Sequence, residues 1–224
     1  MTYIGEVSNT DVIWFGIVVI VALLVWLLAR KSSELAVRLT RIVTSFGWEA
    51  PRRVWWNGAL RGRWRGFDVE LRELGRAKRV PERLLLIVNT ASPARVMVSR
   101  RGSVLNKPLT IFGPPIVEPM SPALREQFWI RSDELALVER LFARADVAPE
   151  FARNLLVRFD VTDLQPKQLR ILRAVDDSAV KKRFDRPFLR FGRDYELIET
   201  IAAEEWKLAV MIVETLGLRG YEAA

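Results

Sequence analysis

Three pairs of neighbouring carboxylates are the residues of this chain whose types could carry out catalysis. The pairs Asp133-Glu134, Asp176-Asp177 and Glu204-Glu205 could bind Mg²⁺ or act as general acid and base. Side chains that are adjacent in sequence point in different directions on helices and strands, so no pair forms a clamp by itself. The first pair suits the first turn of a helix, the second an exposed loop and the third the wet face of a helix. We therefore predict no catalytic residue and no metal ligand among them.

Two residue types are missing from the chain, and their absence narrows the chemistry further. There is no Cys, which excludes disulfides, iron–sulfur clusters, thiolate nucleophiles and covalently attached haem. There is no His, which removes imidazole metal ligands, Ser-His-Asp hydrolysis, His ligation of haem and the usual protein ligand of a chlorophyll. Neither a GxxxxGK[ST] loop nor a GxGxxG turn after a strand occurs. The sequence predicts a protein that is not an enzyme and binds no cofactor through its own side chains.

Residues 12 to 29 form an apolar run, VIWFGIVVIVALLVWLLA, that Arg30 and Lys31 close. A stretch of this length bounded by cations is typical of a transmembrane helix. The preceding residues 1–11 contain no Lys or Arg, and no Ala-x-Ala site follows, so we predict an uncleaved anchor. The alternative is a helix buried in a protein core. Lipid or pigment contact at the surface of this helix stays open.

The flanks of the run predict its orientation. Arg30 and Lys31 would lie in the cytoplasm and the acidic tail, residues 1–11, in the periplasm. Trp14 and Trp26 lie near the two ends of the run, as aromatic residues at a membrane interface do. The sequence thus predicts a single-pass protein of a bacterial inner membrane with a cytoplasmic C-terminal domain.

The positive charge of the chain is concentrated just after this run. The net charge is +8, and residues 30–79 hold thirteen Lys/Arg and five Asp/Glu, which is the whole excess. Arginine and tryptophan alternate there, and we predict partner or lipid contacts for Arg52, Arg53, Trp55, Trp56, Arg61, Arg63, Trp64 and Arg65. The pattern also suits nucleic acid, but a membrane tether favours lipid or a neighbouring membrane protein as the partner. A third interpretation is a solvated basic surface with the tryptophans in the core.

Periodicity predicts the elements behind the run. Helical spacing predicts an amphipathic helix over 30–47 with Gly47 as its C-cap. Alternation predicts a strand from Phe67, joined through a turn at Gly66 to a strand over 59–63, and further strands over 83–88, 95–99, 128–131, 156–161, 168–175 and 187–191. Ser132 is expected to cap a helix over 133–145, another short helix begins at Pro149, and Gly217 ends a long helix over 195–216.

These elements predict one domain over 48–224. Strands come in runs and helices are inserted late, which favours an α+β fold with mainly antiparallel strands. The predicted organisation is therefore a tail (1–11), a transmembrane helix (12–29), a juxtamembrane helix (30–47) and a cytoplasmic α+β domain with a long C-terminal helix. Whether 12–47 form one continuous helix does not follow from the sequence.

In layout the chain resembles the H subunit of purple-bacterial photosynthetic reaction centres. The matching parts are MTYIGEVSNTD, the 12–29 helix, ARKSSE and the domain behind them; no sequence motif matches, so no functional residue is transferred. The resemblance implies an accessory subunit of a reaction-centre–antenna complex that binds no pigment. A respiratory or envelope complex would fit the residues equally well.

We therefore expect a non-catalytic assembly subunit whose partners are other integral membrane proteins of a larger complex, together with anionic lipids. The alternatives are a tethered enzyme that uses carboxylates and a module that binds anionic lipid or nucleic acid. The identity of the complex, its stoichiometry and the presence of a ligand pocket do not follow from the sequence.

Overall fold

The computed structural model describes residues 9–54, 59–74, 83–101, 114–118, 122–155, 160–175 and 195–220, and on the helix α1 it describes the side chains of 14–23 and 37–45. The helices are α1 (Asn9–Ser45), α3 (Pro122–Gln127), α4 (Leu135–Phe142), α5 (Val147–Asn154) and α7 (Tyr195–Leu216). The strands are β1 (Glu49–Val54), β2 (Ala59–Trp64), β3 (Phe67–Leu74), β4 (Arg83–Val88), β5 (Thr90–Ala91), β6 (Val96–Arg100), β7 (Phe128–Ser132), β8 (Val161–Gln165), β9 (Gln168–Ala174) and β10 (Arg219–Gly220). After α1 the chain forms six strands in succession, β1 to β6, and the other described helices come later in the sequence.

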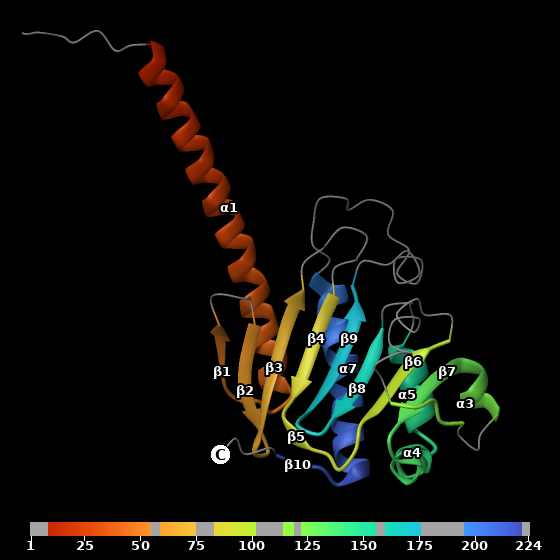
Figure 1. Ribbon diagram of the computed structural model, residues 1–224. Coiled ribbons are helices and arrows are strands. Elements are labelled where there is room, and N and C mark those ends of the chain that lie inside the picture. The colour runs from red at the N-terminus through yellow and green to blue at the C-terminus, as the bar shows by residue number, and fades with distance from the viewer. Residues whose placement is uncertain are drawn as a thin grey trace, which may run out of the picture.

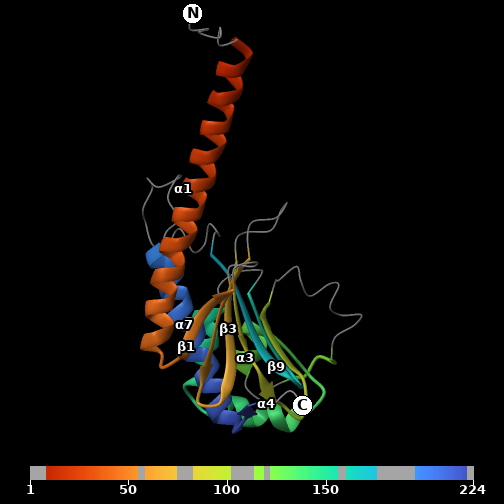
Figure 2. The same ribbon diagram turned by 90° about the vertical axis from the view of Figure 1, so that its left-hand side faces the viewer.

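Eight of the strands form one sheet in the order β1-β2-β3-β4-β9-β8-β6-β7, and every pair in it is antiparallel. The helix α7 packs against β4 and β9, and the last turns of α1 pack beside it on the same face (Figures 1 and 2). Side chains alternate between the two faces of a strand. The apolar residues of β2 to β4 consequently lie under the helices, whereas Arg61, Arg63 and Asp68 are exposed on the opposite face.

Glycines shape the turns that close this core. The β2–β3 hairpin turns through Arg65 and Gly66, both with positive φ (48° and 84°), as a two-residue turn of the primed type requires. Gly47 (φ 81°) and Gly217 (φ 62°) end α1 and α7, where the amide of the next residue bonds a carbonyl five positions back. The turn predicted at Gly66 and both predicted C-caps are thus confirmed.

The core between sheet and helices contains a cluster of aromatic rings. Trp206 of α7 lies 5.8 Å from Phe46, 5.4 Å from Trp48 and 5.0 Å from Trp64, measured between ring centroids. Trp64 also packs against Phe67 at 5.6 Å. Aromatic pairs at these distances stabilise a fold beyond the area that they bury. The cluster joins the end of α1 to the first hairpin and to α7.

The structure corrects the prediction for residues 12–29. Residues 12–29 belong to α1, one helix that continues through the predicted juxtamembrane segment to Ser45, a continuity that the sequence left open. In the part of the chain that the structure describes, no helix combines the length and the apolar character needed to cross a membrane. This finding contradicts the transmembrane helix, the single-pass inner-membrane location, the periplasmic tail and the assignment to photosynthesis.

The helix α1 nevertheless has two different parts. Near its C-terminus, Leu39 and Val43 are buried against the domain, and Arg38 lies 3.5 Å from Glu199 of α7. Its N-terminal half projects away from the sheet (Figures 1 and 2), and a helix of 37 residues is about 55 Å long. Along the projecting half the apolar side chains are exposed, for example Trp14 at 62% and Phe15 at 72%.

Two further expectations are wrong in detail. Ser132 does not cap a helix: its hydroxyl bonds the backbone of Glu134, and α4 begins only at Leu135. The strand predicted over 156–161 begins at Val161, and residues 156–159 lie outside the described part of the chain. The strand predicted over 187–191 lies wholly outside it.

Candidate functional site

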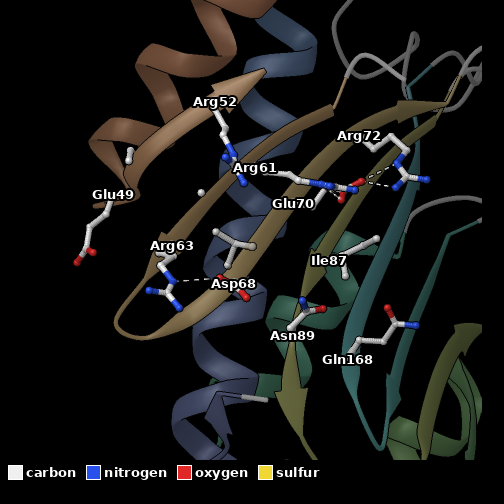
Figure 3. A pocket seen from close by; sticks show the side chains of 13 residues that line it. Glu49, Arg52, Arg61, Arg63, Asp68, Glu70, Arg72, Ile87, Asn89 and Gln168 are labelled. Atoms are coloured by element: carbon white, nitrogen blue, oxygen red, sulfur yellow. Dashed lines mark hydrogen bonds and ion pairs between the residues drawn. The ribbon is translucent and has the colours of Figure 1, made fainter. Parts of the chain in front are cut away.

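The helix-free face of the sheet holds a hollow of about 740 Å³ over β1 to β4 (Figure 3). Four arginines line it: Arg52, Arg61, Arg63 and Arg72. Acidic, amide and apolar residues complete the lining, among them Glu49, Asp68, Glu70, Ile87, Asn89 and Gln168. The volume lies within the range of natural ligand sites, although charged side chains rather than apolar ones dominate this lining.

Strand register explains why these side chains gather. Arg52 of β1 is paired with Arg61 of β2, which is paired with Glu70 of β3, and Glu70 is paired with Ile87 of β4. Directly paired residues project from the same face of a sheet. The charged row therefore follows from the alternation within each strand once the strands are aligned.

Glu70 is the electrostatic centre of the hollow. It accepts hydrogen bonds from Nε of Arg61 at 2.6 Å and from Nε of Arg72 at 2.7 Å, and its side chain is only 12% exposed. Charge-assisted bonds of this kind are shorter and stronger than neutral ones. One carboxylate thus holds two guanidinium groups, and a positive charge remains between them.

The other two arginines of the hollow, Arg63 and Arg52, form weaker ion pairs or none with described residues. Arg63 Nε donates to Asp68 at 3.1 Å, and both side chains are more than half exposed, so this pair contributes little stability. Arg52 has no acidic partner among the described residues. Arginine donors in the hollow therefore outnumber the carboxylate oxygens that accept from them.

The predicted contact residues separate into distinct places. Arg52, Arg61 and Arg63 come together in the hollow. Trp64 is buried at 6% exposure in the core, as the interpretation with core tryptophans expects, and Arg65 bonds Glu214 of α7 at 3.0 Å. Arg53 is paired with Leu60, whose side chain faces the helices. Trp55 and Trp56 lie outside the described residues.

The residues predicted for a membrane interface lie on α1. Trp14 is exposed, and Trp26, Arg30 and Lys31 belong to the part of α1 whose side chains the structure does not describe.

Sequence reasoning missed the acidic centre and the far side of the hollow. The alternation along β3 already placed Asp68, Glu70 and Arg72 on one face, but nothing local said that Arg61 lies opposite Glu70. Gln168 comes from β9, which is remote in sequence yet adjacent to β4. The strand alternation was the usable signal, and the pairing of strands was the missing one.

A second polar cluster lies beneath α7, on the helix-covered side of the sheet. Arg173 is 2% exposed and donates to Asn154 Oδ1 at 3.2 Å and to Glu204 Oε2 at 2.8 Å. Glu150 is 3% exposed and accepts from Lys207 Nζ at 2.8 Å. These bonds join α5, α7 and β9, and we interpret the cluster as structural.

Glu205 lies fully buried beside this cluster, not on the wet face that the sequence predicts. Neither of its carboxylate oxygens has a hydrogen-bond partner. Burial raises the pKa of Glu205 well above its usual value, an effect that the nearby positive charge of Arg173 only partly opposes. The folded chain therefore favours the protonated form of Glu205 more strongly than the unfolded chain does.

The predicted carboxylate pairs do not converge on a site within the described residues. Asp133 and Glu134 are exposed, Glu204 bonds Arg173, and Asp176-Asp177 lie outside the described part. Among the described residues no group of three or more acidic side chains could hold a metal ion. None of the four described members of these pairs lines the hollow.

No known protein family, no curated protein and no solved structure matches this chain. The fold and the site therefore stand on their own geometry, and the resemblance in layout to the H subunit stays a prediction.

Proposed function

We propose that this chain is a non-catalytic assembly subunit of a larger protein complex, and that residues 14–23 of α1 are enclosed by helices of partner proteins. The observation that carries the proposal is the exposure of the projecting half of α1. Eight large apolar side chains on it are 45% to 72% exposed: Trp14, Phe15, Ile17, Val18, Val19, Ile20, Val21 and Leu23.

The distribution of these side chains says what kind of contact they need. Successive helical residues are rotated by about 100°, so an unbroken apolar run covers the whole circumference of the helix. An amphipathic surface helix would bury one stripe and leave the rest polar. A helix that is apolar all round needs apolar neighbours on several sides. A bundle of partner helices supplies them, whereas one flat protein surface does not.

The buried end of α1 supports a bracing role. Leu39 and Val43 fix the helix to the domain, and the aromatic cluster around Trp206 joins its last turn to the first hairpin. A partner that binds the projecting half of α1 is thereby connected to the sheet through packed side chains. Nothing in the described hollow arranges a nucleophile beside a base, and two of its carboxylates, Glu70 and Asp68, accept hydrogen bonds from arginines.

Native purification in a mild detergent tests this proposal. Val18→Asn combined with Val21→Asn changes two exposed positions that touch no part of the domain core. We expect the wild-type chain to co-purify with defined partners in fixed ratio and the double variant to lose them. The matched control is Leu135→Asn, which places the same polar group at an exposed apolar position of α4 (45% exposed). Recovery of the wild-type chain alone would contradict the proposal.

A further inference from the structure

The hollow over β1 to β4 faces outward and carries more positive than negative charge. The side chains of Arg52, Arg61, Arg63 and Arg72 surround it, and Glu70 and Asp68 lie among them (Figure 3). The third acidic residue of the lining, Glu49, points away from the arginines (Figure 3). The arginines therefore carry a surplus of two positive charges over the carboxylates that lie among them.

The arginine donors are not exhausted by these carboxylates. A guanidinium offers five N–H donors in a planar fork that matches a carboxylate. Glu70 occupies some donors of Arg61 and Arg72, and Asp68 accepts from Arg63. Arg52, at the edge of the sheet, has no acidic partner among the described residues. Donors thus remain available to a further anion.

The shape of the charged region favours an extended ligand. Strand pairing places Arg170 of β9 beside Ile87 of β4, in the same row as Arg52, Arg61 and Glu70; the next residue of the row, Asp163 of β8, accepts from Arg95. With about 4.8 Å between strands, Arg52 and Arg170 lie roughly 19 Å apart across the sheet. A single phosphate or carboxylate cannot reach both ends of this row, whereas an extended chain with several carboxylates can.

We infer that the arginine-lined hollow binds an acidic, extended segment of a partner protein. The described lining contains no aromatic residue on which a base could stack, which disfavours single-stranded nucleic acid. The arginines surround a concave hollow rather than a flat plane, which disfavours the surface of a lipid bilayer. Carboxylates spaced along an extended chain fit both the donors and the span of the row.

This inference rests on the proposed function in one respect, because the site is weak alone. Exposed ion pairs contribute little individually. When α1 already holds the partner, the acidic segment binds at a raised effective concentration, and the two contacts reinforce each other. The hollow then sets which partner is accepted, and α1 provides most of the affinity.

Fluorescence anisotropy of a labelled polyglutamate peptide tests the inference on the full chain in nonionic detergent. A peptide of about eight residues, extended to roughly 27 Å, spans the row. We expect a Kd on the order of 0.1 to 1 mM at low salt. Raising the salt from about 20 mM to about 150 mM should weaken binding about tenfold. No saturable binding would overturn the inference.

Two variants with opposite expected effects sharpen the test. Arg52→Glu breaks no ion pair among the described residues and should weaken binding of the peptide at least about fivefold. Glu70→Gln releases Arg61 and Arg72 and should tighten binding about threefold, provided that thermal unfolding shows a folded chain. Should that variant not fold, the result with Arg52→Glu decides. The matched control is Arg140→Glu, which makes the same charge change at an exposed position of α4.

Each remaining outcome is decisive. An equal loss with Arg140→Glu shows general charge attraction and overturns the site. Binding of phosphatidylglycerol vesicles or of oligothymidine that depends on Arg52, without peptide binding, assigns the hollow to another polyanion and also overturns it. The peptide assay contains no partner protein. Its failure is thus distinct from failure of the proposed function, which the purification of the α1 variants measures.

Discussion

At the scale of the residue, Glu205 is the ionisable group most affected by its surroundings. Its carboxyl is completely buried, has no hydrogen-bond partner and lies near Arg173, Asp160 and Glu204. Desolvation raises its pKa well above 4.5, the value expected for an unfolded chain. The folded chain therefore binds this proton more tightly than the unfolded chain does.

The sign of the pH dependence follows from that difference. The stabilising effect of the raised pKa is fully present below pH 4.5 and is lost as the pH rises toward the folded-state pKa. Glu205→Gln keeps the size of the side chain and removes its ionisation. We expect the variant to gain stability relative to the wild type as the pH rises above 4.5 toward the folded-state pKa, by up to about 1.4 kcal/mol per pH unit. Urea unfolding at several pH values measures this, and a difference that does not change with pH would contradict it.

Gly62 is the second residue with a specific requirement. A Cβ at this position would lie 3.1 Å from the backbone oxygen of Glu49 and 3.1 Å from the ring of Trp48. The Trp48 ring can approach the backbone of β2 this closely because Gly62 has no side chain. We expect Gly62→Ala to lower the free energy of unfolding by roughly 1 to 3 kcal/mol, because it overpacks the aromatic cluster.

The control for Gly62→Ala is Gly16→Ala on α1, where an added Cβ meets no atom within 4 Å. Denaturant unfolding compares the two variants. The control should leave the stability of the domain unchanged, and equal stability of both variants would show that the close approach of Trp48 is not required.

At the scale of the element, α1 is one helix with two environments. Two valines on it make the comparison direct, because Val43 is 0% exposed and Val37 is 60% exposed. We expect Val43→Ala to cost about 2 kcal/mol and to loosen α1 from the domain, whereas Val37→Ala should cost little. Denaturant unfolding and hydrogen exchange of residues 37–45 measure both effects. Equal costs would show that α1 is not held by its last turns.

The elements also show which predictions a sequence can support. The alternation of β3, the turn at Gly66 and the cap at Gly217 are determined by residues close in sequence, and the structure confirms them. The N-cap at Ser132 was wrong because its hydroxyl forms a local turn instead. The predicted membrane helix was wrong because no helix in the described part of the chain is both long enough and apolar enough to cross a membrane.

The candidate site was predictable only in part. Arg61 and Arg63 share a face because of the alternation along one strand, which the sequence shows, whereas Arg52 joins them through the pairing of β1 with β2. The bonds of Glu70 and the burial of Glu205 depend on which distant strands and helices become neighbours. The pairing of β4 with β9 joins segments about 85 residues apart, and no local pattern determines that partner. Periodicity assigns a side chain to a face, but only tertiary pairing assigns its neighbours.

At the scale of the whole molecule, the fold separates two surfaces. The exposed apolar half of α1 projects from the domain, and the arginine-lined hollow lies on the sheet face that the described helices leave uncovered (Figures 1 and 3). Between these two surfaces, the polar cluster around Arg173 and the aromatic cluster around Trp206 hold the helices against the sheet. Both surfaces are the ones through which the proposed assembly subunit would contact its partners.

Photo-crosslinking from α1 in native material is the most direct measurement of the central claim. A benzophenone amino acid at Val18 should give adducts of defined mass with a partner protein, because this position is 61% exposed in the isolated chain and the proposed function encloses it in the complex. The same group at Leu135 of α4 should give none. Adducts with lipid alone, adducts with a second copy of this chain, or equal labelling from both positions would contradict the account.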